Sequence, residues 1–212
     1  MKIEIWSDFV CPYCYLAEKK LEKALETFED KENIEISFRS FQLDSNEVRH
    51  ERGNYYDFIS KKYGVPYESA KARIDATKSE AAKVGLNYRY DIMIRNNTSL
   101  AHQAAKFAKD EGKEKLLVDS FFKAYFEEGA DLGNLDTLLS LAGKIGLNRE
   151  KLEKVLKEKS YLSEVTKDQI EASSIGITGV PFFIIDDKVA VSGAQSIEHF
   201  KGALKKAAEM SL

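Results

Sequence analysis

The sequence predicts an α/β fold in which a large helical insertion separates the second and third strands of a small sheet. Three observations carry this expectation. A strand, a helix and a strand follow one another early in the chain, helical spacing then dominates residues 44–176, and a hairpin with a final helix closes the chain. The first helix is long enough to cross over between parallel strands, as in a βαβ unit. We therefore expect one domain from residues 1–43 and 177–212 and an insertion over residues 44–176.

The first strand is expected over residues 2–6, where isoleucines alternate with Glu4 and Trp6. A helix with an apolar stripe follows from about Pro12 to near Asp30. Residues 34–43 then alternate with period two, which indicates the second strand.

The insertion contains no convincing strand. Helical spacing predicts helices over residues 55–63, 67–84, 98–110, 113–127, 135–145, 149–159 and 163–175. Between them, residues 87–95 are aromatic and irregular and are expected to be extended. Gly85, Gly146 and Gly176 each precede an apolar residue at a predicted helix end. This is typical of a glycine in the left-handed position followed by a residue that packs back on the helix.

Strand character returns at residues 181–186. Asp187 and Lys188 are expected to form a tight turn, and residues 189–193 the hairpin partner. Ser196 can cap a last helix over residues 197–210.

Composition limits the classes of function. The chain has 212 residues, 43% of them hydrophobic, and a net charge of −3 with lysines and acids interleaved, so we expect no nucleic-acid partner. No apolar run approaches the roughly 20 residues that cross a bilayer, and the N-terminus lacks the apolar core of a signal peptide. We expect a cytoplasmic protein with no membrane partner, as a monomer or a homodimer.

The two cysteines, Cys11 and Cys14, lie where the first strand passes into the first helix. A helix N-terminus favours an anion, and this placement lowers a thiol pKa to roughly 3.5–7.5 in known Cys-x-x-Cys sites. Pro12 suits the first helical position, where its missing N–H costs nothing. Cys14 follows one turn later on the same face, so one cysteine can attack a disulfide and the other can resolve the product.

The same pair of cysteines allows three other interpretations. A zinc site needs a second pair of ligands, and the histidines, His50, His102 and His199, are scattered, so we expect no metal. A structural disulfide over so short a loop constrains the unfolded chain very little. Two inert cysteines remain an alternative.

A second motif, Gly179-Val180-Pro181-Phe182-Phe183, opens the hairpin. On local grounds its X–Pro bond is expected to be trans. The order of elements, however, resembles the thioredoxin superfamily, whose cis-proline loop faces the Cys-x-x-Cys motif. The long helical insertion resembles the DsbA branch. Within that branch, four segments are similar to the FrnE-like group: residues 8–15, residues 97–102, residues 178–183 and residues 192–195. This group is close to the 2-hydroxychromene-2-carboxylate isomerases and the kappa-class glutathione transferases.

The resemblance implies a thioredoxin-like fold with Cys11 as nucleophile, Cys14 as resolving thiol and Pro181 as the cis-proline. Val180 would offer main-chain groups to an extended substrate. Isomerase and transferase relatives usually carry serine where this chain has Cys11, which favours disulfide exchange. The Cys-Pro-Tyr-Cys motif is like that of glutaredoxins, so the same likeness implies a potential of roughly −200 to −230 mV.

Further substrate-binding candidates are Asn97, Thr98, His102, Phe9 and Tyr13. Asn97 and Thr98 can equally cap a helix, and a helix histidine is more often satisfied by a neighbour than catalytic. Phe9 and Tyr13 would line an apolar groove beside the thiols, with the insertion as its roof.

We expect a thiol–disulfide oxidoreductase whose partners are peptide, protein or small-molecule thiols and disulfides. It would hold no tightly bound cofactor, with glutathione as a possible co-substrate. Two alternatives stay open: a glutathione-dependent transferase or isomerase, and a non-catalytic redox-sensing module.

Overall fold

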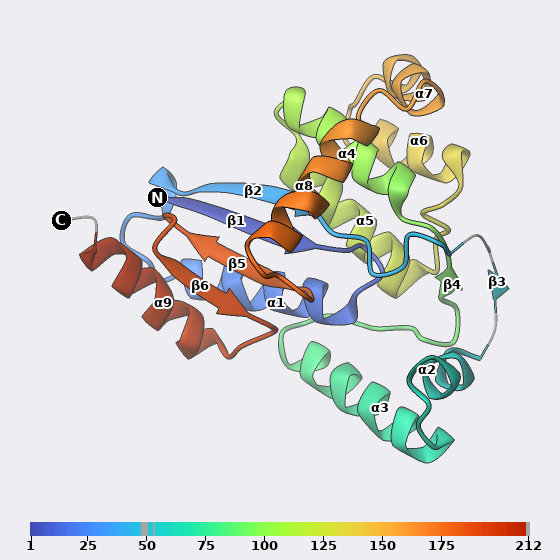
Figure 1. The fold of residues 1–212 in the computed structure, drawn as a ribbon, viewed down its shortest axis with the longest axis horizontal. Coiled ribbons are helices and arrows are strands. Elements are labelled where there is room, and N and C mark those ends of the chain that lie inside the picture. The colour runs from blue at the N-terminus through green and yellow to red at the C-terminus, as the bar shows by residue number, and fades with distance from the viewer. Residues whose placement is uncertain (48–50, 53, 211–212) are drawn as a thin grey trace.

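The main sheet joins the two ends of the chain. The computed structural model describes residues 1–47, 51–52 and 54–210. Its four-stranded sheet has the order β2-β1-β5-β6 (Figure 1). The strands are β1 (Lys2–Ser7), β2 (Glu35–Ser40), β5 (Phe182–Ile185) and β6 (Val189–Ser192). β1 and β2 run parallel, which confirms the βαβ unit around α1 (Pro12–Leu25), and the other pairs are antiparallel.

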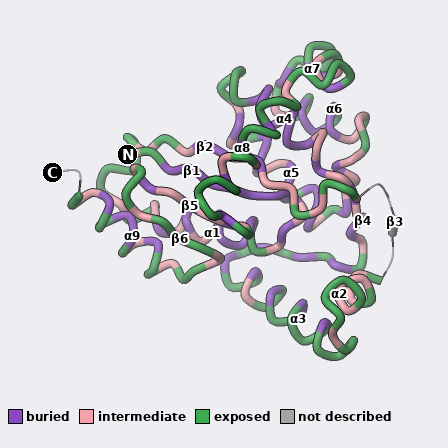
Figure 2. Tube along the Cα trace, viewed as in Figure 1, coloured by how far each residue is buried: buried purple, intermediate pink, exposed green. Residues whose placement is uncertain are grey.

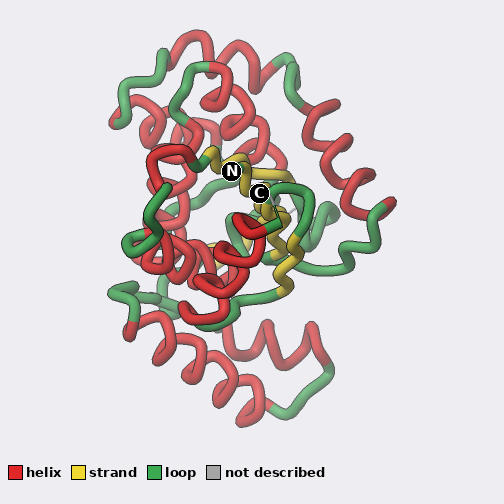
Figure 3. Tube along the Cα trace, turned by 90° about the vertical axis from the view of Figure 1, so that its left-hand side faces the viewer, coloured by secondary structure: helices red, strands yellow, loops and turns green. Residues whose placement is uncertain are grey.

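The helices after α1 occur in the order along the chain that the sequence predicts. They are α2 (Tyr55–Tyr63), α3 (Tyr67–Lys83), α4 (Ser99–Asp110), α5 (Glu114–Glu128), α6 (Leu135–Lys144), α7 (Arg149–Lys157), α8 (Leu162–Ser174) and α9 (Ile197–Glu209). Helices α4 to α7 gather next to β2 and α8 lies across β2, whereas α2 and α3 form a separate hairpin (Figure 1). Figure 3 shows the strands surrounded by helices. No helix within the described residues combines the length and apolar character needed to cross a bilayer.

The two faces of the sheet are buried against different helices. Ile3 and Ile5 on β1 belong to the large core cluster that includes Leu21 on α1 and Leu204 on α9. Trp6 points to the other face and packs in a smaller cluster with Ala172 of α8. Successive residues of a strand point to opposite faces, so the alternation in β1 separates these two layers. Figure 2 shows β1 buried along most of its length.

Helix α1 ends at Leu25, five residues before the predicted end near Asp30. The hydroxyl group of Thr27 donates to the carbonyl oxygen of Ala24, a local bond that competes with the helical ladder. A short 3-10 helix, η1 (Lys31–Asn33), then leads into β2.

The insertion is not entirely helical, which corrects the expectation of an all-helical segment. β3 (Glu51–Arg52) pairs antiparallel with β4 (Ile94–Arg95) in a two-stranded ladder. The extended segment expected over residues 87–95 is therefore a strand only at its end. A two-residue strand is too short for any alternation to show in the sequence.

Chain reversals use left-handed residues, as expected at the helix ends. Gly85, Gly146 and Gly176 have φ values of 89°, 74° and 80°. After each of them, the next N–H donates to a carbonyl five residues back, at 2.8–3.0 Å. This is the hydrogen bond of the Schellman motif. The hairpin turn centres on Asp186 and Asp187, with φ values of 51° and 54°, one residue earlier than expected.

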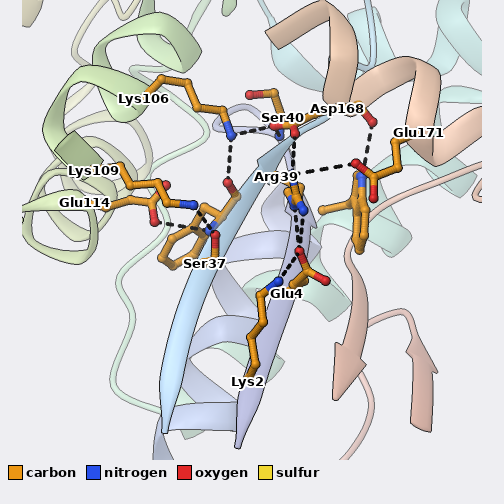
Figure 4. A network of polar contacts seen from close by, with 12 residues as sticks. Lys2, Glu4, Ser37, Arg39, Ser40, Lys106, Lys109, Glu114, Asp168 and Glu171 are labelled. Carbon is orange, nitrogen blue, oxygen red and sulfur yellow. Dashed lines mark hydrogen bonds and ion pairs between the residues drawn. The ribbon is translucent and has the colours of Figure 1, made fainter. Parts of the chain in front are cut away.

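A buried ionic network ties α8 to the sheet (Figure 4). The carboxylate of Asp168 accepts hydrogen bonds from Ser40 N–H at 2.8 Å and from Arg39 at 3.0 Å, and pairs with the Lys106 ammonium at 2.5 Å. Arg39 also pairs with Glu4. Because α8 leads directly into the loop that contains Pro181, this network helps to position that loop.

Candidate active site

Both cysteines lie at the start of α1, as the spacing predicts. Cys11 is the N-cap residue, with an extended backbone at φ −89° and ψ 111°, and Pro12 is the first helical residue. The N–H of Cys14 donates to the carbonyl oxygen of Cys11 at 3.0 Å, which closes the first turn. Only 3% of Cys11 and 2% of Cys14 is exposed. Exposure alone therefore does not separate the two thiols.

The two thiols differ in their surroundings. Both cysteines belong to the core cluster, but Cys11 also lines a cavity beside the motif and Cys14 does not. Burial raises the pKa of the Cys14 thiol well above its usual value, and the neighbouring Cys11 raises it further. Hydrogen bonds from the Asp8 backbone and the Ser7 side chain oppose this shift. The geometry is suited to an attacking Cys11 and a Cys14 that stays protonated until it is needed.

The loop before β5 faces the motif. The Val180–Pro181 peptide bond is cis, the form that the resemblance implies and local statistics do not. The Cys11 thiol donates a hydrogen bond to the carbonyl oxygen of Val180, with the sulfur 3.7 Å from the oxygen. Val180 is half-buried and also lines the cavity. Backbone groups of this loop therefore lie next to the thiol.

We call the space beside Cys11 the thiol cavity. Its volume is about 200 Å³. One wall is formed by α2 and α3 of the insertion, with residues such as Tyr55, Phe58 and Thr77. Val180, in the loop before β5, also lines this cavity. The insertion thus covers the motif, which agrees with the expectation of a roofed groove.

The structure brings only some of the expected substrate-binding residues to the thiol cavity. Thr98 and Tyr13 line it together with Val180. Tyr13 is 41% exposed, and its hydroxyl group lies 3.2 Å from that of Thr77. Thr98 is 2% exposed and is the N-cap of α4 without a capping side-chain bond.

Three other candidates do not line the thiol cavity. The Asn97 side chain donates to the Ser45 carbonyl and accepts from the Ser99 N–H and from the Gln42 side-chain amide, so groups of the protein itself satisfy it. His102 and Phe9 lie behind the motif in the core, with ring centroids 5.0 Å apart. Neither offers an exposed surface to a substrate. His50 lies outside the described residues.

Residues that the sequence analysis did not single out complete the cavity wall. Asp8 and Asn96 are 1% and 4% exposed, and Tyr90 and Tyr125 are 3% and 2% exposed. All four line the thiol cavity. Asp8 is part of the motif segment, so its proximity to Cys11 could have been recognised. The convergence of Tyr90 and Tyr125 depends on how the insertion packs.

A group of carboxylates on α1 and α5 has the spacing of a metal site. Oxygens of Glu18, Glu22 and Asp119 lie within 4.8 Å of one another. The Lys115 ammonium already lies among them, at 3.2 Å from Glu18 and 2.5 Å from each of the other two. Burial raises the pKa of Glu18 to about 8. We interpret the cluster as an ion-pair network rather than a cation site.

The comparisons with known proteins agree with this geometry. The family model described as a DSBA-like thioredoxin domain matches residues 2–205. A crystal structure from Streptomyces coelicolor, described as a probable DsbA oxidoreductase, has 36% identity and a TM-score of 0.92 and covers 99% of this chain and 90% of its own.

Two curated relatives are more distant. YwbO of Bacillus subtilis is 26% identical over 207 residues, which span 95% of this chain and 94% of YwbO. The 2-hydroxychromene-2-carboxylate isomerase of Sphingobium xenophagum is 24% identical over 191 residues, spanning 88% and 90% of the two chains. The chain belongs to the family of DsbA-like thioredoxin domains.

Proposed function

We propose that this chain is a thiol–disulfide oxidoreductase in which Cys11 attacks and Cys14 resolves. The observation that carries the proposal is the asymmetry of the pair: Cys11 caps a helix N-terminus and lines the thiol cavity, while Cys14 is shielded with a raised pKa. A thiolate is the nucleophile in disulfide exchange, and a helix N-terminus stabilises an anion.

In the reducing direction, the Cys11 thiolate attacks one sulfur of a disulfide. An S–S bond forms between Cys11 and that sulfur, and the other half leaves as a thiolate that takes up a proton. Cys14 then loses its proton and attacks the Cys11 sulfur, which breaks the bond between Cys11 and the substrate and releases the remaining substrate half as a thiolate that takes up a proton. The substrate receives two electrons, and the protein keeps a Cys11–Cys14 disulfide. Oxidation of a dithiol substrate is the reverse sequence.

The roofed thiol cavity favours peptide or small-molecule thiols and disulfides over folded proteins, because α2 and α3 stand beside Cys11. Glutathione is the co-substrate that we propose for returning the pair to its starting state. We place the reaction in the cytosol, where a Cys-x-x-Cys pair is more often catalytic than structural.

A second candidate is a glutathione-dependent isomerase or transferase. It is favoured by the relationship to a protein named 2-hydroxychromene-2-carboxylate isomerase and by the small cavity. In that case Cys11 would position a thiol, and Cys14 would be dispensable.

The test is a redox titration of the pair. The protein is equilibrated with glutathione buffers of defined ratio, and the fraction with a Cys11–Cys14 disulfide is measured by mass spectrometry after alkylation. We expect a two-electron transition, with a midpoint in the glutaredoxin range of about −200 to −230 mV. Failure to form the disulfide, together with glutathione turnover in a Cys14→Ser variant, would favour the second candidate.

A further inference from the structure

Two buried oxygen atoms, on residues that line the thiol cavity, have no hydrogen-bond donor among the described residues. Asp8 Oδ1 and Asn96 Oδ1 are both fully shielded and unpartnered among the described residues. Asp8 and Asn96 line the cavity that also contains Cys11. A buried acceptor without a donor costs free energy, and native proteins rarely leave one unpaired without a reason. These two acceptors are therefore suited to a ligand that brings hydrogen-bond donors.

The other contacts of Asp8 hold its carboxylate in place. Asp8 Oδ2 accepts the N–H of Leu43 at 2.8 Å. His102 Nε2 lies 3.4 Å from Oδ1 on the core side, yet neither atom has a hydrogen-bond partner. His102 does not line the thiol cavity. Asp8 thus lies between the His102 ring on the core side and the cavity, with Oδ1 shielded and without a hydrogen-bond donor among the described residues.

Aromatic rings surround the same space. Tyr55, Tyr90 and Tyr125 line the thiol cavity, and the rings of Tyr55 and Tyr90 have centroids 5.0 Å apart. Burial raises the pKa of Tyr125, and the nearby Tyr55 and the charge of Asp8 raise it further. The hydroxyl groups therefore stay neutral. Ring faces carry partial negative charge and attract cations, which makes them compatible neighbours for an ammonium group.

Cations also line the cavity, together with the acids Asp44 and Glu47. Lys62 pairs with Asp44 at 3.5 Å, and Arg95 lies over the Phe58 ring at 4.5 Å. Arg73 is exposed on α3. The buried inner end, by contrast, holds the carboxylate of Asp8. The outer residues therefore carry charges of both signs that pair with one another, whereas the buried end has the carboxylate of Asp8.

We propose that the inner end of the thiol cavity binds the ammonium group of a small aminothiol or of its disulfide, with Asp8, Asn96 and the tyrosine rings as the subsite. The substrate sulfur then meets Cys11. This inference rests on the proposed function and narrows its substrate class to amine-bearing thiols and disulfides.

Cystamine, the disulfide of cysteamine, is the simplest probe. The Cys11 thiolate attacks one sulfur, the S–S bond of cystamine breaks, and one cysteamine leaves as a thiolate that takes up a proton. Cysteamine remains bound to Cys11 through the new disulfide. In a Cys14→Ser variant this adduct cannot be resolved by the second thiol, so its formation rate is measured directly.

The experiment compares three disulfides of similar length on the full-length Cys14→Ser chain: cystamine, bis(2-hydroxyethyl) disulfide and dithiodiglycolate. Adduct formation is followed by mass spectrometry. Each rate constant is divided by that of a peptide of residues 7–15 carrying the same Cys14→Ser change, which removes the intrinsic reactivity of each disulfide. We expect the corrected rate for cystamine to exceed that of the hydroxyethyl compound about tenfold, equivalent to about 1.4 kcal/mol. Dithiodiglycolate should be slowest.

Two substitutions in the Cys14→Ser chain test the assigned residues, because they should change the corrected cystamine preference in opposite directions. Asp8→Asn keeps an acceptor for Leu43 but removes the charge, and should reduce the corrected cystamine preference to near one. Asn96→Asp adds a carboxylate and should increase it. Asp136→Asn removes an exposed charge on α6 at a residue that does not line the cavity, and should leave the ratio unchanged.

The outcomes distinguish failure of the proposed function from failure of the ammonium subsite. If no disulfide reacts at Cys11, the proposed function fails. If the neutral disulfide reacts and cystamine has no corrected advantage, or if Asp8→Asn leaves that advantage intact, the ammonium subsite is wrong while the proposed function stands.

Discussion

The hydroxyl group of Tyr88 donates a hydrogen bond of 2.6 Å to the carbonyl oxygen of Pro12. Tyr88 belongs to the insertion and is fully buried, and its ring stacks on Phe126 with centroids 4.8 Å apart. Pro12 lies between the two cysteines. The insertion therefore lines the thiol cavity and also hydrogen-bonds directly to the Cys-Pro-Tyr-Cys turn through a buried side chain.

The first prediction concerns this contact. Tyr88→Phe keeps the ring packing but removes the hydroxyl group, so the free energy of unfolding should fall by about 1 kcal/mol. Hydrogen exchange of the amides at the start of α1 should become faster, since the turn loses one restraint. Both are measured on the same protein, by urea unfolding and by exchange mass spectrometry. Tyr161→Phe, which removes an exposed bond to Asp110, is the matched control. Unchanged exchange at α1 would show that the turn does not depend on Tyr88.

The second prediction concerns the pH dependence of resolution. Burial raises the pKa of Cys14 well above its usual value, so only a small fraction is thiolate at neutral pH. The rate at which Cys14 releases a fluorescent thiol from a Cys11 mixed disulfide should therefore rise with pH, about tenfold per unit below that pKa. The rate is followed by fluorescence from pH 6 to 9. A plateau reached below pH 8 would contradict the raised pKa.

The third prediction concerns Glu18. Its pKa in the folded chain is about 8, above the ordinary value of 4.5, because the carboxyl group is buried. The unfolded chain loses this proton first as pH rises, so stability contributed by protonated Glu18 declines between about pH 4.5 and 8. Glu18→Gln should flatten that decline in the free energy of unfolding measured at several pH values.

Glu22 provides a control, because its pKa is shifted in the opposite direction to that of Glu18. Lys115 and Lys19, acting against burial, hold its pKa below the usual value. Stability from Glu22 is therefore present above the ordinary carboxyl pKa and lost as the pH falls, so Glu22→Gln should leave the decline toward pH 8 in place. If both variants behave alike, the assignment of the high pKa to Glu18 is wrong.

The fourth prediction concerns the network in Figure 4. Asp168→Ala leaves the buried ammonium of Lys106 and the guanidinium of Arg39 without their shared carboxylate. Removing one partner of a buried pair costs about 3–5 kcal/mol, and we expect a loss of that size in urea unfolding. Asp136→Ala, on the exposed surface, should change stability by less than about 0.5 kcal/mol. A loss below about 1 kcal/mol for Asp168→Ala would mean that the network is not coupled to global stability.

The motif could be located from the sequence because its structure is local. The end of β1, an N-cap at Cys11 and Pro12 at the first helical position follow from residues that are adjacent in the chain. The glycine-terminated helices are local in the same sense. The cis bond at Pro181 was different, because only the order of elements and the family resemblance indicated it.

The rest of the site depends on tertiary packing. Tyr90 and Tyr125 come from segments 35 positions apart and meet only when the insertion folds. Asn97 was expected to contact substrate, yet its side chain bonds to the Ser45 carbonyl, the Gln42 side chain and the Ser99 N–H, and the first two lie more than 50 positions away in the chain. The β3–β4 ladder pairs residues more than 40 positions apart through two residues each, which leaves no periodic signal.

The central claim is that Cys11 attacks and Cys14 resolves, and trapping tests it most directly. Cys14→Ser and Cys11→Ser variants are each mixed with a chromogenic aromatic disulfide, and the adducts are quantified and mapped by peptide mass spectrometry. The account predicts rapid formation of a stable adduct at Cys11 in Cys14→Ser, and slow labelling of Cys14 in Cys11→Ser. Equal rates in the two variants, or faster labelling of Cys14, would contradict it.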